Sequence, residues 1–347
     1  MSRKRRGIFS YFIPLILAVA AAWAGPKFWR DSQPVHLNHP VTLEIEPGSG
    51  ARGIALALEQ SGVVRSRWTF LAWHFSRWPR PKLKAGEYQF DGDVSLSGAY
   101  GKLERGEVFY HELTIPEGLN LFEIGDIVEK SGLASRKDFV AAAHNAALIS
   151  DIAPHAANLE GFLFPDTYRF TRHATAAAMV QAMVARFRQV VAALTKNEKL
   201  PPGRELEVVT LASLVEKETG KSSERPLVAG VFQKRLTMGM PLQCDPTVVY
   251  AAILAGYQGE HGYRGRIYAS DLKRVSPYNT YVNRGLPPGP VANPGLAALE
   301  AAYRPAATDF LYFVADTDGG HVFSRTLAEH ERQVQAYRRK VAQHAHG

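Results

Sequence analysis

An uncharged apolar run near the start of the chain most constrains how this protein folds. Residues 8–24 contain no charged side chain and follow a basic cluster, Arg3 to Arg6. Such a run is at the short end of what crosses a bilayer as a helix, and basic residues mark its cytoplasmic side. We therefore predict a cytoplasmic N-terminus over residues 1–7, a single transmembrane helix over 8–25, and a large remainder outside the cytoplasm.

A cleaved signal peptide is the alternative interpretation of this run. Ala22-Trp23-Ala24 resembles a small-residue cleavage site, although the run is longer than the apolar part of a usual signal peptide. Both interpretations export most of the chain. Residues 26–40 contain three prolines and show no periodicity, so we expect a tether there.

Composition favours a folded chain with a sizeable core. The chain has 347 residues, of which 46% are hydrophobic, and this length is typical of about two domains. Of the net charge of +8, the basic N-terminal cluster supplies four, so the remainder is only mildly basic. The single cysteine, Cys244, excludes an internal disulfide and is interpreted as a free buried thiol.

Two segments resemble each other at an offset of 70 residues, Glu46–Val64 and Pro116–Ala134. Each follows an alternating stretch and has a glycine turn and an apolar helical period that ends at Ser-Gly. The matched positions are Gly48 with Gly118, Ile54 with Ile124, Glu59 with Glu129, and Ser61-Gly62 with Ser131-Gly132. We therefore predict repeated strand–turn–helix units over residues 41–134.

Between these two segments lies a predicted helix that is both basic and aromatic. Its aromatic and basic residues are Trp68, Phe70, Trp73, Phe75, Arg65, Arg67, Arg77 and Arg80. Interleaved residues of these kinds can contact nucleic acid or a membrane. An exported chain is not expected to bind nucleic acid, and we favour ordinary packing with a solvated basic face.

The remainder, residues 135–340, is predicted to be a larger mixed domain, which makes the fold class α+β. Residues 135–200 are mainly helical in pattern, and a new helix is expected to start near Glu205. After Arg235 the chain is richer in Gly, Pro, Asn and Tyr, as in binding loops. Leu311–Ser324 reads as a hairpin around Asp-Thr-Asp-Gly-Gly, and a polar helix follows it.

The helix that starts near Glu205 offers the best candidate for catalysis. Its apolar face consists of Val208, Leu211, Ala212 and Val215. Helical spacing puts Glu218 next on that face, whereas Glu216 and Lys217 are expected to project toward solvent. A carboxyl group at the end of an apolar stripe should have a raised pKa, which suits a general acid. A buried glutamate paired with an arginine for structure is the alternative.

Polar loop residues around this helix are candidates for binding a sugar chain. Aromatic faces and side-chain amides suit stacking on sugars and hydrogen bonds to hydroxyls. The candidates are Tyr168, Gln243, Asp245, Tyr278, Asn279, Thr280, Tyr281 and Asn293. Asp245 and Asp166 are also possible assistants that orient Gln243 or Tyr168. Loop chemistry without any ligand is the alternative.

Several motifs are absent from the sequence. It has no glycine-rich phosphate loop, HExxH or GxSxG, and the closest histidine pair beyond the fold is His344 and His346. His321 in the predicted hairpin is a possible base, although a lone histidine there is more often structural. We expect no metal and no cofactor. A pyridoxal-phosphate lyase would need an inward lysine, and the exported topology argues against it.

These segments together resemble the endolytic murein transglycosylase family, also called YceG-like. The matching pieces are LTIPEG, EGFLFPDTY, LASLVEKET, ERPLVAGVFQKRL, DPTVVY, YNTY, LPPGPVANPG and YFVADTDGGHVFS, in order over about residues 113–330. The region from Val41 to Gly106 matches less sharply. The resemblance implies a small LysM-like subdomain, placed at 41–134, beside a catalytic domain at 135–340.

The resemblance also implies a reaction and a location. The second glutamate of the E-K-E motif, Glu218, would be the catalytic residue. The family would cut nascent peptidoglycan glycan strands at the outer face of the inner membrane, between N-acetylmuramic acid and N-acetylglucosamine, and close a 1,6-anhydro ring. Peptidoglycan synthases are possible partners, and nucleic acid is not. A non-catalytic peptidoglycan-binding scaffold is the alternative function.

Overall fold

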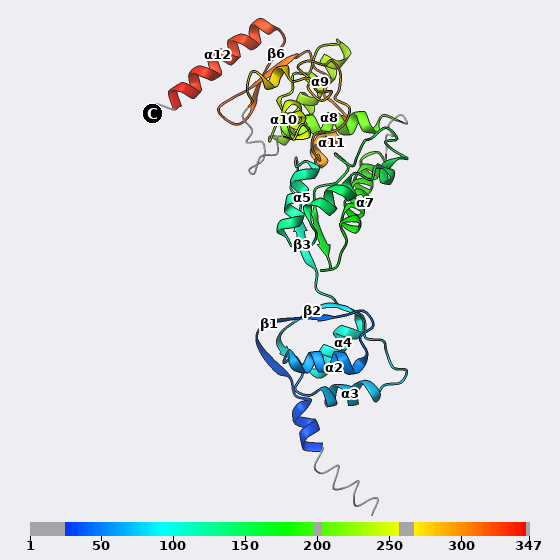
Figure 1. Ribbon diagram of the computed structural model, residues 1–347. Helices are drawn as coiled ribbons and strands as arrows, with labels where there is room; N and C mark the ends of the chain where they lie inside the picture. Colours follow the sequence, from blue (N-terminus) through cyan, green and yellow to red (C-terminus); the bar gives the residue numbers. More distant parts are fainter. Residues whose placement is uncertain (1–24, 197–202, 257–266, 345–347) are drawn as a thin grey trace, which may run out of the picture. The chain divides into compact units, whose positions relative to one another are not determined.

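The chain divides into two compact units, one that ends at His111 and one that begins at Glu112 (Figure 1). This computed structural model describes residues 25–196, 203–256 and 267–344. Residues 8–24, which carry the expected membrane helix, lie outside the described residues, and the helix stays a prediction.

The first unit is built on a two-stranded antiparallel sheet. Strand β1 (Val35–Ile45) pairs with β2 (Gly86–Val94), and their register shifts between Leu37 and Val41. Helices α2 (Ala51–Gln60) and α3 (Arg67–Phe75) connect the strands, and α4 (Leu96–Arg105) follows β2. The core includes Ile54, Leu58, Phe70, Tyr88 and Tyr100, all almost fully buried.

The expected tether over residues 26–40 is wrong in the described structure. Residues 25–31 are helical, and β1 already begins at Val35. The sequence pattern did not predict this strand because its polar residues and Pro40 interrupt the alternation of apolar and polar positions. Proline has no amide hydrogen for a ladder, and Pro40 lies where the register shifts.

The second unit is a helical assembly with two small sheets. Strands β3 (His111–Thr114) and β4 (Thr167–Phe170) form one sheet, and β5 (Tyr312–Ala315) and β6 (His321–Ser324) form an antiparallel hairpin. The helices are α5 (Leu121–Lys130), α6 (Arg136–Ala143), η1 (Ala146–Ile149), α7 (Ala176–Leu194), α8 (Glu205–Glu218), η2 (Ser222–Glu224), α9 (Arg225–Thr237), α10 (Asp245–Leu254), η3 (Asp271–Lys273), α11 (Leu296–Tyr303) and α12 (Leu327–His344). The helix from Glu205 and the hairpin are therefore confirmed.

The two similar strand–turn–helix segments fall in different units. The first forms β1 and α2, whereas the second forms β3 and α5 in the larger unit. Leu121, Ile124 and Val128 of α5 are fully buried in the core of the larger unit. The expected common region at 41–134 is therefore divided near His111, because the second copy packs on the helices that follow it.

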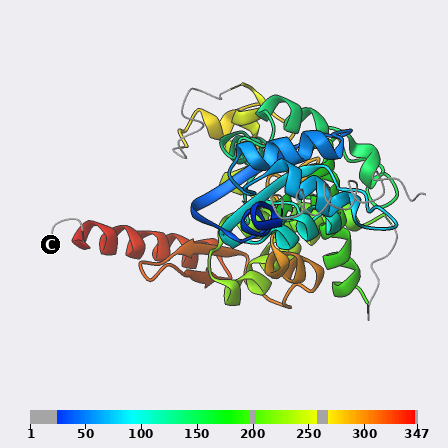
Figure 2. The ribbon, with the colours of Figure 1, turned by 90° about the horizontal axis from the view of Figure 1, so that it is seen from below.

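Helix α8 lies at the centre of the larger unit and contacts α9, α10 and α11. Helix α7 is long and apolar enough to cross a membrane, but Met179, Met183 and Phe187 are almost fully buried, which identifies it as a core helix. Helix α12 packs on the β5–β6 hairpin and projects from the rest of the unit in both views (Figures 1 and 2). The larger unit thus packs helices α9, α10 and α11 around α8.

Candidate active site

Glu218 is the last residue of α8, where the helix breaks into extended backbone at Thr219. The apolar face predicted from spacing is present, since Leu211, Ala212 and Val215 are buried in the core. Glu218 follows on that face and is half-buried. The helix therefore delivers a carboxyl group from the core to the edge of the protein.

The surroundings of Glu218 favour its neutral form. Burial is the main cause that raises the pKa of this carboxyl group, and the nearby carboxylate of Asp245 raises it further. A hydrogen bond from the thiol of Cys244 lowers the pKa of Glu218, and so do the charges of His321 and Arg235. Among the described residues, Glu218 has no ion pair within 4 Å. Its proton is thus held in a partly exposed group, as a general acid requires.

Hydrogen bonds join the loop before α10 to the segment that contains Thr280. The hydroxyl oxygen of Thr280 accepts the backbone amide of Cys244 at 3.0 Å and lies 2.9 Å from the hydroxyl of Thr247. The backbone amide of Gln243 donates to the carbonyl of Thr280 at 3.2 Å. These bonds join the DPTVVY and YNTY segments, as the predicted site needs.

Gln243 has an unusual backbone conformation. Its φ of +53° is the only positive value at a non-glycine position in the described chain. A left-handed conformation at such a residue persists only where the surrounding contacts impose it, and it is frequent at functional sites. The Gln243 side chain is exposed beside buried Cys244. This residue is therefore well placed to contact a ligand at Glu218.

Asp245 and Tyr281 form a pair at the same edge. Asp245 is the first residue of α10, and it accepts a 2.6 Å hydrogen bond from the Tyr281 hydroxyl. Burial and this aspartate raise the pKa of Tyr281, so the hydroxyl stays protonated. The charge of Glu218 also contributes to that shift, so the three groups lie within electrostatic reach of one another.

The β5–β6 hairpin brings His321 to this site, a position that sequence reasoning treated as structural. Nδ1 of His321 lies 2.7 Å from the carboxylate of Glu224, and its backbone amide donates to the same group at 3.1 Å. Glu224 also accepts a 3.3 Å bond from the hydroxyl of Thr219, next to Glu218. Although burial opposes it, these hydrogen bonds lower the pKa of Glu224. No local sequence pattern predicts that His321 of the DTDGGH stretch pairs with Glu224, which follows the end of α8.

Glu216 does not project toward solvent, which corrects the expectation from helical spacing. Its side chain is 6% exposed and accepts a 2.7 Å bond from Arg225, which is 7% exposed. The amide of Gly295 also donates to Glu216 at 3.0 Å. The turn after α8 brings Arg225 back against the helix, and spacing alone cannot show this. Glu216 is thus the structural glutamate, whereas exposed Lys217 donates to the carbonyl of Gly118 at 3.0 Å.

A second carboxyl group, Glu160, is completely buried beneath these loops. Its oxygens accept hydrogen bonds from the amide of Leu121, the hydroxyl of Tyr250 and the side-chain amide of Asn293. Burial raises the pKa of Glu160 to about 8. Asn293 also donates to the carbonyl of Leu119 and accepts the amide of Leu163. Asn293 is fully buried, so its role is to hold loops together rather than to contact sugar directly.

The remaining predicted binding residues lie in two settings. Asn279 is fully buried and donates to the carbonyls of Leu272 and Arg274, so it is also structural. Tyr278 packs on Tyr250 with ring centroids 5.0 Å apart. Half-buried Tyr168 donates to the carbonyl of Phe164 and stacks on Phe170.

The described interactions of Tyr168 and of its neighbour Asp166 do not reach Glu218. Asp166 accepts a 2.7 Å bond from Arg186 instead of assisting the site. The sequence signal that grouped this segment, FPDTY, with the site was its polar and proline-stiffened composition. Of the predicted binding residues, Asp245 and Tyr281 interact electrostatically with Glu218, and Gln243 and Thr280 belong to the loops that hold Cys244 beside it.

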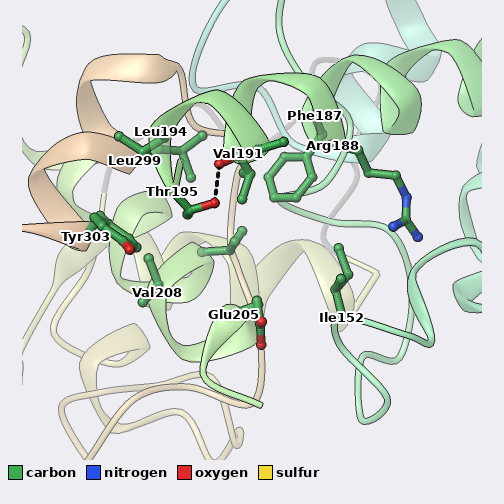
Figure 3. A pocket seen from close by; sticks show the side chains of 12 residues that line it. Ile152, Phe187, Arg188, Val191, Leu194, Thr195, Glu205, Val208, Leu299 and Tyr303 are labelled. Carbon is green, nitrogen blue, oxygen red and sulfur yellow. Dashed lines mark hydrogen bonds between the residues drawn. The ribbon is translucent and has the colours of Figure 1, made fainter. Parts of the chain in front are cut away.

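A cavity of about 400 Å³ lies elsewhere, between α7, α8 and α11 (Figure 3). Its walls are mainly apolar, including Phe187, Val208 and Leu299, and Glu218 is not among its lining residues. Arg188 points away toward its ion pair with Asp151, 2.6 Å apart. None of the predicted site residues lines this cavity, so it is separate from the candidate site at Glu218.

Within the described ranges, no group of three or more His, Cys, Asp or Glu side chains is arranged to hold a metal ion. Asp245, the carboxylate beside Glu218, is bonded to the hydroxyl of Tyr281, which is a weak metal ligand while protonated.

Comparison with known proteins decides the family. The sequence profile of the YceG-like family matches residues 43–336. The chain belongs to the YceG-like family. The match covers the first unit from residue 43 onward and nearly all of the second, so both units contribute to it.

Two curated relatives and one solved structure are similar to this YceG-like chain. An endolytic murein transglycosylase of Bacillus subtilis is 33% identical over 86% of this chain and 84% of its own length. One of Streptococcus pneumoniae is 32% identical over 94% of this chain and 64% of its own length. A crystal structure of a YceG-like protein from Listeria monocytogenes has a TM-score of 0.55 and 31% identity, covering 85% of this chain and 99% of that one.

Proposed function

We propose that this YceG-like chain is an endolytic peptidoglycan transglycosylase in which Glu218 is the catalytic acid and base. The observation that carries this proposal is the half-buried carboxyl group at the end of α8, with a raised pKa and no ion pair in the described structure. Relatives that bear the name endolytic murein transglycosylase match most of the chain.

One carboxyl group is sufficient for the reaction. Glu218 donates its proton to the oxygen of the glycosidic bond as the bond from that oxygen to the anomeric carbon of N-acetylmuramic acid breaks. The fragment that begins with N-acetylglucosamine leaves as an alcohol. The resulting carboxylate then takes the proton of the 6-hydroxyl of the N-acetylmuramic acid unit. That oxygen attacks the anomeric carbon and closes a 1,6-anhydro ring. The proton returns to Glu218, and no water is consumed, so no second carboxylate is needed as a nucleophile.

The residues beside Glu218 support binding and positioning of a glycan strand. The exposed amide of Gln243 suits hydrogen bonds to sugar hydroxyls and acetamido groups. Tyr281 offers an aromatic ring for stacking, and its bond to Asp245 fixes the ring. Thr280 acts indirectly, since its buried hydroxyl holds the Cys244 backbone.

We propose that the first unit is the LysM-like part and that it follows a membrane anchor. The strand–helix–helix–strand order of β1, α2, α3 and β2 supports the first point. The uncharged run at residues 8–24 supports the second and puts the N-terminus in the cytoplasm and both units outside it. Peptidoglycan synthases remain candidate partners in this location.

Mass spectrometry of peptidoglycan digested by the full-length chain in detergent tests the function. Products that end in 1,6-anhydro-N-acetylmuramic acid support the proposal. Products with reducing ends instead indicate a hydrolase, because water has taken the place of the 6-hydroxyl. Glycan that binds but stays uncut indicates the non-catalytic scaffold.

A further inference from the structure

The first unit carries a surface that the proposed function does not use. It consists of helix 25–31 and the segment from Arg65 to Lys84, and we call it the basic aromatic surface. Five large apolar side chains are exposed on it: Phe28, Trp29, Trp68, Phe75 and Trp78. Trp68 is 67% exposed and Trp78 is 88% exposed. Such side chains rarely gather on the free surface of a soluble protein unless they contact something.

Helix α3 is apolar on two faces, although only one face is covered. Thr69, Phe70, Leu71 and His74 are buried against the unit. Trp68, Ala72 and Phe75, which follow the spacing i, i+4 and i+7, are exposed on the other side. A helix that is apolar all round normally lies in a core or against lipid.

The charges of the segment from Arg65 to Lys84 are of one sign, and the one acidic residue of helix 25–31, Asp31, is buried and pairs with Arg30 at 3.3 Å. Arg65 to Lys84 contains six basic residues and no acidic residue. Arg67 and Arg77 have acidic neighbours outside the segment, Glu59 at 3.7 Å and Glu104 at 4.0 Å. Exposed Arg80 and Lys82 have no ion pair among the described interactions. The surface therefore complements an anionic partner.

The two parts of the surface are close in space. A nitrogen of the Arg65 guanidinium donates to the carbonyl of Pro34, which follows helix 25–31, at 3.1 Å. The start of the segment that contains α3 thus lies beside the chain that leaves helix 25–31, which carries exposed Phe28 and Trp29 and follows the predicted membrane helix. Tryptophan and arginine side by side are typical of groups at the interface between lipid headgroups and acyl chains.

We propose that the basic aromatic surface lies against the anionic lipid headgroups of the membrane. Trp68, Phe75 and Trp78 enter the interfacial layer, and Arg80 and Lys82 bind lipid phosphates. A basic residue near an anionic membrane surface contributes about fivefold in affinity. The surface would hold the first unit on the bilayer and give the chain a second membrane contact besides the anchor.

Tryptophan quenching by brominated lipids tests this contact, because all five tryptophans of the chain lie between residues 23 and 78. The full-length chain with Trp23→Phe and Trp29→Phe is reconstituted into vesicles of brominated phosphatidylglycerol or brominated phosphatidylcholine. We expect loss of most emission with phosphatidylglycerol and a much smaller loss with phosphatidylcholine. Adding Trp68→Phe and Trp78→Phe should leave only the weakly quenched emission of Trp73.

Charge reversal separates lipid recognition from simple proximity to the anchor. Arg80→Glu with Lys82→Glu should abolish most of the quenching by phosphatidylglycerol. Lys130→Glu with Lys137→Glu, a matched change at exposed sites of the larger unit, should leave it unchanged. The proposal would be overturned if phosphatidylglycerol did not quench the emission. It would also be overturned if quenching were equal in the two lipids and in the two charge-reversal variants. A shift of emission produced by soluble glycan strands, with none produced by lipid, would assign the surface to glycan instead.

Discussion

Two carboxyl groups in the larger unit have raised pKa values for the same reason, yet their surroundings differ. Glu160 is 1% exposed and accepts hydrogen bonds from Leu121, Tyr250 and Asn293. Glu218 is half-buried, and its described hydrogen-bond partner is the thiol of Cys244, a weak donor. A raised pKa alone therefore does not mark a catalytic acid. Access to substrate and a lack of strong partners distinguish the two.

The sharpest test of this difference is Glu218→Gln. Glutamine keeps the shape but cannot transfer a proton, and proton transfer contributes about 10²–10⁴ in rate. We expect release of anhydro ends to fall by that factor while the melting temperature, measured by circular dichroism, stays within a few degrees. The matched control is Glu207→Gln on the exposed face of the same helix, which should keep full activity. An active Glu218→Gln enzyme would remove the catalytic assignment.

Glu216→Gln should act on stability instead of on the chemical step. It leaves the buried guanidinium of Arg225 with Glu117 at 3.7 Å as its remaining described carboxylate. Breaking a buried ion pair costs about 3 kcal/mol. Chemical denaturation followed by circular dichroism should therefore show a lower free energy of unfolding. A variant that is as stable as the parent but inactive would instead exchange the roles of Glu216 and Glu218.

Glu160→Gln tests the buried member of the comparison through the pH dependence of stability. The folded pKa of about 8 lies above the value in an unfolded chain, so the folded state retains a proton that the unfolded state releases. Stability from this group is complete below about pH 4 and is lost as the pH rises to about 8, by about 1.4 kcal/mol per pH unit. Glutamine should flatten this slope between pH 5 and 8 in denaturation experiments. An unchanged slope would contradict the protonated state of Glu160.

Asp245→Asn should have the smallest effect of the four. Burial is the main cause of the raised pKa of Glu218, and the negative charge of Asp245 adds to it. Removing that charge lowers the pKa of Glu218, so the fall of activity at high pH should begin at a lower pH than in the parent. Tyr281→Phe is a useful control because it removes the 2.6 Å bond and keeps the charge. Identical pH profiles for the parent and Asp245→Asn would show that the aspartate does not influence Glu218.

Sequence reasoning was most successful where one local period decides the structure. The run from Glu205 to Glu218 is one helix, and Leu211, Ala212 and Val215 of its expected apolar face are buried. The hairpin around Asp316 to Gly320 follows from its turn residues. These features depend on neighbours within a few positions along the chain.

The failures concern contacts made over long sequence distances. Helical spacing put Glu216 in solvent because nothing near it shows that Arg225 folds back. Asn279 and Asn293 were grouped with the ligand-binding loops, but their amides satisfy buried carbonyl groups of those same loops. His321 reaches Glu224 across 97 residues, which no local pattern predicts. Position in the sequence thus identified the helix that carries the site but not the groups that complete it.

The burial of the Cys244 thiol affects how the protein withstands oxidation outside the cytoplasm. In the oxidising compartment that we propose, an exposed thiol is captured by oxidants and by other thiols, and one cysteine can form only a crosslink to another molecule. Cys244 is 1% exposed, and burial together with Glu218 raises its pKa, so little thiolate is present to react. Burial of Cys244 therefore protects the folded chain from forming a disulfide-linked dimer. This protection requires that α10 packs against α8, as it does in the folded protein.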